Sequence, residues 1–461
     1  MVVQHNMQAA NANRMLNITT GAQSKSTEKL SSGYRINRAA DDAAGLSISE
    51  KMRKQIRGLD KASSNAEDGV SSVQTAEGAL TEVHSMLQRM NELAVQASNG
   101  TNSDTDRGAI QDEISQLTTE IDRVAETTKF NETYLLKGGN GTKDVYMNGH
   151  DAGLKGTLTD SATTATFKVA AGALDAGKSV TIGGKDYTIG STLAETKALA
   201  TAAKAATNTS FTVDDTKYNV DAAGKITKDG DTTEVTVDDI VKIGSKVSYD
   251  GKTLTAADID TTTGVDKSDS SVISAAHAVD LMEKELTAAN NIGATKTAAT
   301  AKKAAAYTSK DGVTFDIKKG TAEVADKLSF SLHVGSDADM TNKITVDIET
   351  MNSSYLGIKG LNVNDDSGIA GTYAIDAISD ALQKVSEQRS SLGAVQNRLE
   401  HTIDNLDNVV ENTTTAESRI RDTDMAEEMV NYSKNNILAQ AGQSMLAQAN
   451  QSNQGVLSLL Q

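Results

Sequence analysis

Residues 73–97 read VQTAEGALTEVHSMLQRMNELAVQA, and the spacing of the apolar residues in this stretch decides the fold. The apolar positions lie alternately three and four residues apart, at Val73, Ala76, Leu80, Val83, Leu87, Met90, Ala94 and Ala97. Such a repeat places the apolar side chains on one narrow face of a helix, with polar residues over the rest. The stretch therefore predicts a long helix that packs against other helices in a coiled-coil-like bundle.

Two other stretches continue this pattern and supply the partner helices. Residues 110–124 carry apolar residues four and three positions apart, and residues 375–409 carry them every seven positions. We expect the bundle seam to consist of Val73, Leu80, Leu87, Ile114, Ile121, Ile378, Val385, Leu392, Leu399 and Leu406. The predicted fold class is mainly α: a coiled-coil-like helical bundle formed by both chain termini, with an inserted β-rich module.

The middle of the chain alternates apolar and polar residues, which is typical of half-buried strands. Residues 180–189 and 211–220 have apolar residues at the same offsets, and each segment has a turn-forming pair at its centre, Gly183-Gly184 or Asp214-Asp215. We expect two β-hairpins there and a looser third copy at 241–249. Helices are expected at 192–206 and 271–289, and later strands at 315–317, 328–334 and 344–348.

The two extreme ends of the chain carry thinner apolar stripes. One stripe holds Val3, Met7, Ala10 and Ile18, and the other holds Leu438, Ala441, Met445, Ala449, Val456 and Leu459. Glutamine and asparagine surround both stripes, so each end alone buries too little apolar surface to offset the entropy of ordering it. We expect these ends to be disordered in a single chain and helical only when packed against copies of themselves.

Composition narrows the function classes. The chain has 461 residues, a net charge of -17, and neither cysteine nor proline. Disulfides and cysteine-ligated zinc are therefore excluded, and the chain folds without slow prolyl isomerisation. The negative charge argues against nucleic acid and anionic membranes as partners. The amino terminus lacks the cationic head and apolar run of a signal peptide, and no stretch approaches the roughly 20 apolar residues of a membrane helix.

Candidate chemistry is sparse. The histidines lie more than five residues apart, so they show no zinc-site spacing; they are His5, His84, His150, His277, His333 and His401. Residues 172–179, GALDAGKS, fit the phosphate-loop pattern G-x-x-x-x-G-K-[ST], but a true phosphate loop opens a helix, and an alternating strand follows here. We interpret this match as chance. We predict no catalytic, cofactor-binding or metal-binding residues, and hence no enzyme.

A basic segment, residues 35–61, holds seven Lys and Arg residues against four acidic ones. Two interpretations stay open for it. One is a solvated helix face, and the other is a surface that meets an acidic groove on a neighbouring subunit. The segment lacks the interleaved aromatic residues that would stack on nucleic acid bases.

Several motifs closely resemble bacterial flagellins. Residues 30–48, LSSGYRINRAADDAAGLSI, resemble the family's link between its terminal helix and its first long helix. Residues 418–425, SRIRDTDM, and 437–450, ILAQAGQSMLAQAN, resemble its carboxyl-terminal signature. Residues 130–136, FNETYLL, resemble the end of its amino-terminal conserved region. The resemblance covers about 1–140 and 326–461, and the middle of the chain corresponds to the family's variable region.

The resemblance implies a structural subunit that is exported unfolded by the flagellar type III apparatus. The subunits would polymerise into the extracellular flagellar filament for swimming motility. The implied partners are other copies of the chain in a helical homopolymer, an export chaperone on the carboxyl-terminal helix, and the hook-associated junction and cap proteins. The polymerisation helices would use Val3, Met7, Ile18, Leu438, Ala441, Met445, Ala449, Val456 and Leu459. The alternative is a hook–filament junction or cap-type protein with the same terminal design.

The resemblance also implies a division of the chain into domains. These are 1–45, an amino-terminal inner-tube helix and link; 46–140, the amino-terminal half of the bundle; 141–325, the variable β-rich surface-exposed module; 326–415, the carboxyl-terminal half of the bundle with a β-hairpin; and 416–461, the carboxyl-terminal inner-tube helix.

Host recognition is implied by one segment of the first long helix. Residues 87–96, LQRMNELAVQ, resemble the form L-Q-R-x-x-E-L-A-V-Q that Toll-like receptor 5 recognises in flagellins, although Asn91 departs from the common arginine. The expected receptor contacts are Gln88, Arg89, Glu92, Leu93, Gln96 and Glu113. Because Leu87, Met90 and Ala94 continue the seam, we expect Arg89, Glu92, Leu93 and Gln96 to lie nearer the outer face of the helix.

Overall fold

The computed structural model of the chain describes residues 6–260, 262–365 and 368–458, with residues 453–458 described by their backbone alone. These residues divide into two compact units. The described residues of 1–71, 331–345 and 395–461 form the terminal unit, and those of 72–330 and 346–394 form the central unit. Two long helices, α2 (Ala43–Ala97) and α8 (Ile369–Arg421), run through both units.

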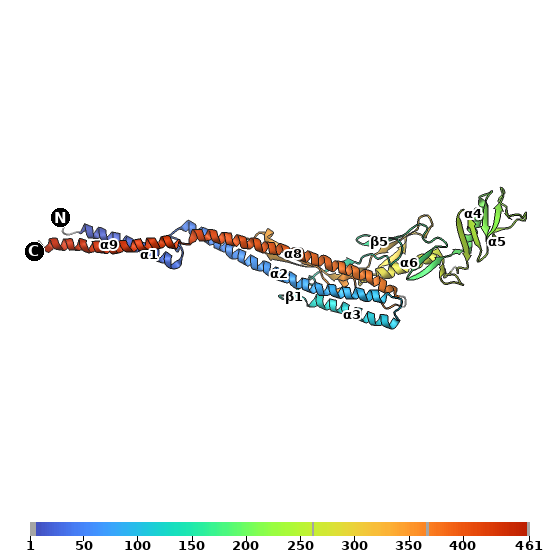
Figure 1. The fold of residues 1–461 in the computed structure, drawn as a ribbon, viewed down its shortest axis with the longest axis horizontal. Coiled ribbons are helices and arrows are strands. Elements are labelled where there is room, and N and C mark those ends of the chain that lie inside the picture. The colour runs from blue at the N-terminus through green and yellow to red at the C-terminus, as the bar shows by residue number, and fades with distance from the viewer. Residues whose placement is uncertain (1–5, 261, 366–367, 459–461) are drawn as a thin grey trace. The chain divides into compact units, whose positions relative to one another are not determined.

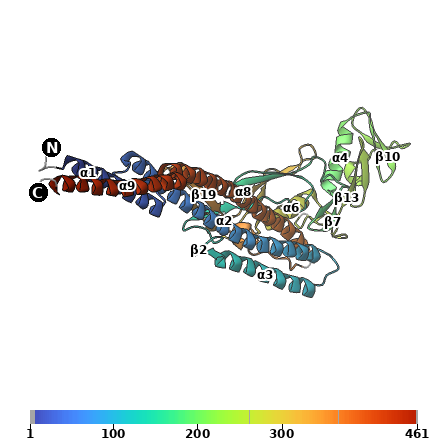
Figure 2. The same cartoon turned by 60° about the vertical axis from the view of Figure 1, so that its left-hand side comes forward.

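Helices from the two ends of the chain pair in the terminal unit. α1 (Met7–Ser32) and α9 (Met425–Ser458) lie side by side and antiparallel (Figures 1 and 2). Here the structure differs from the expectation that each end is helical only against copies of the chain. The described residues of both stripes nevertheless stay exposed, apart from half-buried Ala449, so the two helices touch through other residues and leave the stripes uncovered within one chain.

The remainder of the terminal unit packs α2 and α8 around two small cores. The first core contains Ala66, Val334, Ile344 and Leu399, and the second contains Leu59, Ala62 and Leu406. Strands β18 (Leu328–His333) and β19 (Lys343–Ile348) pair with each other, joined through the short 3-10 helix η1 (Met340–Asn342). Gly69 lets β18 approach α2, because a β-carbon at this position would lie 2.2 Å from a Leu332 methyl carbon.

In the central unit, a third helix, α3 (Asp104–Thr127), accompanies α2 and α8. Ser103 and Asp106 form a capping box that begins α3, satisfying backbone N–H groups that have no partner within the helix. All ten residues predicted for the seam are buried, with Leu87, Val385 and Leu392 fully so. The prediction of a helical bundle built from both chain ends is confirmed.

Short elements follow α3. β1 (Lys129–Phe130) and β2 (Thr133–Tyr134) form a small hairpin, β3 (Thr142–Tyr146) pairs antiparallel with β17 (Thr321–Ala325), and α7 (Ser353–Leu356) precedes α8. Two lobes of sheet and helix lie between β3 and β17 in the sequence. The predicted β-rich insert is therefore confirmed.

The first lobe has a four-stranded sheet, a three-stranded sheet and helix α6 (Ala275–Asn290). The strand order is β15-β16-β5-β4 in the larger sheet and β14-β7-β6 in the smaller one. Its core includes Phe167, Phe315 and Met282, and Tyr373 of α8 belongs to the same apolar cluster. The strands are β4 (Thr157–Asp160), β5 (Thr164–Val169), β6 (Ser179–Ile182), β7 (Lys185–Ile189), β14 (Val272–Ile273), β15 (Thr300–Lys303) and β16 (Val313–Lys318).

The second lobe has a six-stranded sheet of order β11-β10-β9-β12-β13-β8, with helices α4 (Leu193–Ala205) and α5 (Val237–Ile240). Its core, which includes Phe211, Val213 and Ala200, is separate from that of the first lobe. The strands are β8 (Ser191–Thr192), β9 (Ser210–Val213), β10 (Thr216–Val220), β11 (Ile226–Lys228), β12 (Lys246–Tyr249) and β13 (Lys252–Ala257).

Two of the three expected hairpins are present. β6 pairs with β7 around Gly183-Gly184, and β9 pairs with β10 around Asp214-Asp215, with positive φ at all four turn residues as a tight two-residue turn requires. The prediction of a third hairpin at 241–249 is wrong. Residue Ile243 is 56% exposed and lies outside any strand, and β12 instead forms its hairpin with β13.

Candidate functional site

The two family-like motifs from opposite ends of the chain meet in the terminal unit and form one junction. Tyr34 and Asp422 form an antiparallel bridge, the backbone N–H of Arg35 donates to the Arg421 carbonyl at 2.6 Å, and that of Thr423 donates to the Gly33 carbonyl at 3.0 Å. Gly33 ends α1 with φ of 75°, a conformation that favours glycine. The junction therefore ties the end of α1 to the start of α9.

Side chains reinforce this junction. The Arg421 guanidinium stacks over the Tyr34 ring, 4.9 Å from its centroid, and donates to Glu50 on α2 at 3.1 Å. The Arg35 guanidinium donates to the Ile420 carbonyl. Buried Ser49 donates its hydroxyl to Glu417 at 3.0 Å. Arginine suits this position because its planar group can stack on a ring and donate several hydrogen bonds at once.

The turn between α1 and α2 depends on two neighbouring carboxylates. Asp41 accepts the backbone N–H groups of Arg38 and Asn37, and these hydrogen bonds lower the pKa of its carboxyl group. Asp42 accepts the backbone N–H of Gly45 at 2.8 Å at the start of α2. A β-carbon on Gly45 would lie 2.4 Å from the Asp42 carboxylate, so a larger residue at this position would force the Asp42 side chain to shift.

The helix pair α1–α9 is held by few buried contacts. The side-chain amide of Asn6 donates to the Ala449 carbonyl at 3.1 Å, and Lys29 pairs with Glu428 at 3.7 Å. Gly442 faces Leu16, and Ala439 is a buried apolar residue of α9. Small residues at this interface let the two helices approach closely while burying little apolar surface.

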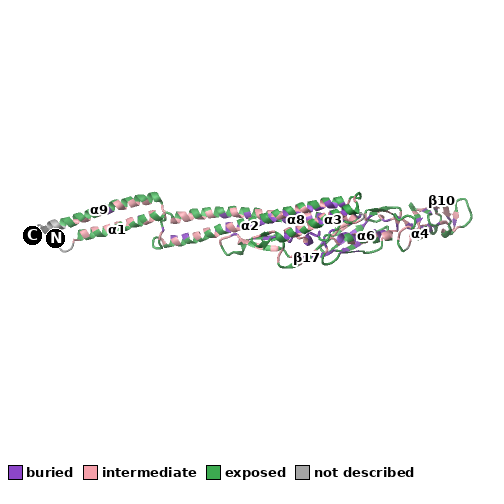
Figure 3. Cartoon of the chain, turned by 90° about the horizontal axis from the view of Figure 1, so that it is seen from below, coloured by how far each residue is buried: buried purple, intermediate pink, exposed green. Residues whose placement is uncertain are grey.

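Large apolar side chains of α1 and α9 consequently face outward. We call these residues the terminal patch, and their exposed fractions range from 47% to 72%: Met7, Met15, Ile18, Met429, Val430, Ile437, Leu438 and Met445. So many exposed apolar side chains on one helix pair are typical of an association surface. Figure 3 shows that exposed and half-buried residues dominate these helices, whereas buried residues recur along α2 and α8.

Several residues predicted for polymerisation belong to this patch, namely Met7, Ile18, Leu438 and Met445. Ala441 is exposed and Ala449 is half-buried. Val3 and Leu459 lie outside the described residues, and the side chain of Val456 is not among those described. The sequence prediction omitted Val430 and Ile437, although their separation of seven residues marks one face of a helix.

The residues predicted to contact the receptor lie on α2 and, in the case of Glu113, on the neighbouring helix α3. Arg89 donates to Glu113 of α3 at 2.9 Å and to Glu92 at 3.2 Å. Gln88, Arg89, Glu92 and Gln96 are exposed, and Glu113 is half-buried. The expectation that Leu93 lies near the outer face is wrong, because Leu93 is only 2% exposed. α2 forms ion pairs with α3 through Arg89 and with α8 through Glu77, and a helix with partners on two sides buries a wider stripe.

The phosphate-loop-like motif does not open a helix. Ser179 begins strand β6, and the backbone N–H groups of Gly177 and Lys178 donate to carbonyls of Ile189 and Asp175. Within the described part of the chain, no three His, Asp or Glu residues are grouped closely enough to hold a metal ion. None of the described helices combines the length and apolar character needed to cross a membrane.

Comparison with known proteins identifies similar chains. The family described as "Bacterial flagellin N-terminal helical region" matches residues 3–141, and that described as "Bacterial flagellin C-terminal helical region" matches residues 375–460. A flagellin of Clostridium tyrobutyricum is 41% identical over 462 residues, covering 98% of this chain and 100% of that protein. A flagellin of Bacillus subtilis is 36% identical over 462 residues, covering 100% of both.

Among solved structures, FliC from Burkholderia pseudomallei matches with a TM-score of 0.27 and 20% identity, covering 72% of this chain and 99% of that one. The two family matches contain the described seam residues, the junction and the terminal patch, and leave residues 142–374 between them.

Proposed function

Because this chain belongs to the bacterial flagellin family and is a structural subunit of the extracellular flagellar filament, we propose that helices α1 and α9 supply the contacts between subunits. The terminal patch is the observation that carries this proposal. Its side chains, such as Met7 at 72% and Val430 at 68% exposure, are apolar surface that another copy would remove from water. Each large side chain so buried contributes about 1.5–3 kcal/mol. Head-to-tail contacts of this kind generate a helical filament when they do not close into a ring.

The test is removal of residues 438–461, which deletes Leu438 and Met445 from the patch. The seam lies outside the deleted segment, so the shortened chain should remain soluble and helical. It should fail to polymerise. Sedimentation and electron microscopy of the assembled protein measure this outcome, and long filaments from the shortened chain would contradict the proposal. Filaments of the full chain also distinguish a filament subunit from a junction or cap-type protein.

In this proposal, segments 1–45 and 416–461 form the inner tube, and the bundle halves 46–140 and 326–415 form the outer tube. Residues 141–325 face solvent as the variable module. The two lobes have cores separate from the small cores of the terminal unit, which supports this division. Replacing 141–325 by a short Gly/Ser closure should preserve polymerisation, because closing a shorter loop costs little entropy. Loss of the helical circular dichroism signal in that variant would contradict these boundaries.

Export of the unfolded chain through the flagellar type III apparatus is part of the proposal. The absence of proline supports it, because the chain can then refold without isomerisation delays. The exposed apolar face of α9, with Ile437 at 67% exposure, would be the binding site of an export chaperone before assembly. Hook-associated junction and cap proteins would contact the same terminal helices at the two ends of the filament.

Host recognition by Toll-like receptor 5 is proposed for the exposed side chains around Arg89. Arginine is frequent among binding hot spots, and Arg89 is an exposed residue of α2. Arg89→Ala should weaken binding of the monomer to the receptor ectodomain by at least about tenfold. Arg123→Ala is the matched control, since Arg123 is also exposed and pairs with a glutamate three residues away. Equal affinity of the two variants would remove this surface from the proposal.

A further inference from the structure

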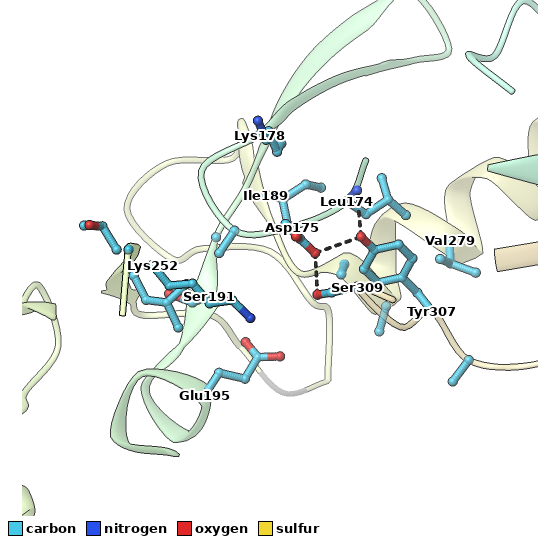
Figure 4. Close-up of a pocket in the computed structure, with 18 of the residues that line it drawn as sticks. Leu174, Asp175, Lys178, Ile189, Ser191, Glu195, Lys252, Val279, Tyr307 and Ser309 are labelled. Carbon is cyan, nitrogen blue, oxygen red and sulfur yellow. Dashed lines mark hydrogen bonds between the residues drawn. The ribbon is translucent and has the colours of Figure 1, made fainter. Parts of the chain in front are cut away.

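A cavity of about 620 Å³ lies in the central unit where the two lobes adjoin. Figure 4 shows the side chains that surround it. From the first lobe, the wall contains residues of the loop 174–178, the end of β7, the start of α6, and the end of β15 with the loop that follows it. From the second lobe, it contains residues of β8, α4 and β13. This volume lies within the range of small-molecule binding pockets, which is about 300–1,000 Å³.

Hydrogen bonds hold two carboxylates in the cavity wall, and each carboxylate uses only one of its two oxygens in these bonds. Asp175 accepts hydrogen bonds from the hydroxyls of Tyr307 and Ser309 through the same oxygen, as Figure 4 shows. Glu195 accepts from the backbone N–H of Thr192 at 2.8 Å, also through one oxygen. The second oxygen of each carboxylate has no hydrogen-bond donor among the described residues. Both carboxylates are therefore oriented acceptors with capacity for a ligand.

Ammonium groups balance these carboxylates. Lys178 and Lys252 line the cavity, and no described carboxylate lies within 4.0 Å of either amine. Lys303 also lines it but is paired with Asp280 at 2.6 Å. Two unpaired amines thus match the two carboxylates, so the wall carries acceptors and donors without a net charge. This balance favours a neutral polar ligand over an anion or a cation.

Apart from Ser191 and Thr253, the remaining wall consists of apolar residues and glycine. Leu174, Ile189 and Val279 line the cavity and are among the buried core residues of the first lobe. The backbone N–H groups of the loop are already committed, because those of Gly177 and Lys178 donate to carbonyls and that of Leu174 donates to the Tyr307 hydroxyl. The loop therefore has no cradle of free N–H groups for a phosphate.

We propose that this cavity binds a neutral sugar residue. A sugar presents hydroxyls that both donate and accept, which suits carboxylate acceptors beside ammonium donors, and it presents C–H faces that suit the apolar wall. The proposal goes beyond the filament function and does not depend on it. A free saccharide and the terminal sugar of a glycoconjugate share this chemistry.

The test uses the full chain as a monomer. Saturation-transfer NMR with galactose, mannose, N-acetylglucosamine and lactose probes free neutral sugars, with sialic acid and inorganic phosphate as anionic comparisons. An array of immobilised glycans probes terminal sugars on glycoconjugates. We expect binding of at least one neutral sugar in one of these formats and weaker or no binding of both anions.

Variants locate the bound sugar. Lys252→Gln and Asp175→Asn should each lower the affinity at least about tenfold, because each removes a charged hydrogen-bonding partner. The matched controls are Lys217→Gln on the second lobe and Asp186→Asn on the first; both side chains are exposed and lie outside the cavity wall. Circular dichroism checks folding, and Ser309→Ala provides a further cavity variant if Asp175→Asn fails to fold. Binding of anions alone, no sugar binding, or equal affinity in cavity and control variants would overturn the proposal.

Discussion

The helix pair α1–α9 and the bundle of α2 and α8 are both built from long antiparallel helices. They differ in how far their large apolar side chains are exposed to solvent. In the bundle, Leu87 and Leu392 are fully buried, whereas Met7 and Val430 in the terminal pair are 72% and 68% exposed (Figure 3). The bundle thus has an apolar seam that is complete within one chain. The terminal pair leaves its large apolar side chains available to another molecule.

Helical periodicity therefore specifies which face of a helix is apolar, but it does not specify which molecule covers that face. A seam with a strict seven-residue repeat of large residues buries enough surface to stabilise a single chain. A thin stripe flanked by Gln, Asn, Gly and Ala lets two helices touch through small residues such as Ala439 and Gly442, and the larger side chains then point outward. We infer that the bundle determines monomer stability and that the terminal pair determines assembly.

The largest expected effect separates these two roles completely. The double substitution Val430→Asp with Ile437→Asp places two charges in the terminal patch. Burying an unpaired charge against another subunit costs far more than the lost apolar contact, so assembly should be abolished. The free energy of unfolding of the monomer should change by less than about 0.5 kcal/mol, as for other exposed positions. Sedimentation measures assembly, and urea unfolding measures stability.

The matched control adds the same two charges to exposed polar positions of α9, as Ser433→Asp with Gln440→Asp. Filament formation by the control but not by the patch variant would attribute the effect to the apolar face. Filaments formed by both variants would show that the terminal patch has no role in assembly.

The second effect is on monomer stability. Leu392→Ala removes a fully buried seam side chain, and the loss of apolar contacts plus the cavity should cost about 2–5 kcal/mol of unfolding free energy. The same type of change at an exposed apolar residue, Ile437→Ala, should cost less than about 0.5 kcal/mol. Denaturant unfolding of both monomers gives the difference directly. Similar losses in the two variants would show that the terminal pair also stabilises the single chain.

The seam could be predicted from sequence because its information is local. The spacing of Leu80, Leu87 and Ile114 specifies a helix and its buried face without knowledge of any distant residue. The first two hairpins could be predicted for the same reason, since Gly183-Gly184 and Asp214-Asp215 favour tight turns. The predicted hairpin at 241–249 was wrong because β12 forms its hairpin with the strand that follows it, β13, around a turn at Asp250 and Gly251.

The features that could not be predicted from the sequence depend on contacts between residues far apart in the chain. Burial of Leu93 follows from the presence of both α3 and α8 beside α2, which a seam drawn for one partner does not include. The stacking of Arg421 on Tyr34 joins residues from opposite ends of the chain. The cavity near Asp175 requires two lobes to adjoin, and residues 174–178 alone indicated only a chance motif.

A third, smaller effect concerns the junction at the base of the terminal pair. Arg421→Lys keeps the charge but loses the planar guanidinium that stacks on Tyr34 while donating to Glu50. The cost should be about 0.5–2 kcal/mol, the size of a cation–π contact. Arg419→Lys is the control, because Arg419 is exposed and forms no ion pair with the described residues. Limited proteolysis near 33–42 should accelerate in the first variant only. Equal rates would show that the backbone hydrogen bonds alone hold the junction.

The smallest effect is a pH dependence within the bundle. Burial raises the pKa of Asp376 on α8; His150 opposes this rise, and the nearby carboxylates of Asp151 and Asp380 add to it. A carboxyl whose pKa is raised in the folded chain binds more protons there than in the unfolded chain, so its contribution to stability falls as the pH rises above about 3.8, its ordinary pKa.

Asp376→Asn removes the charge and should stabilise the monomer at pH 8, by less than about 1 kcal/mol because solvent screens a half-buried group. The gain should shrink at pH 4, because the raised pKa leaves more of the Asp376 carboxyl protonated in the folded chain at that pH than at pH 8. Urea unfolding at both pH values measures the difference, with Asp404→Asn at an exposed position of α8 as the control. A gain that is the same at both pH values would show that the buried charge of Asp376 does not limit the stability of this part of the bundle.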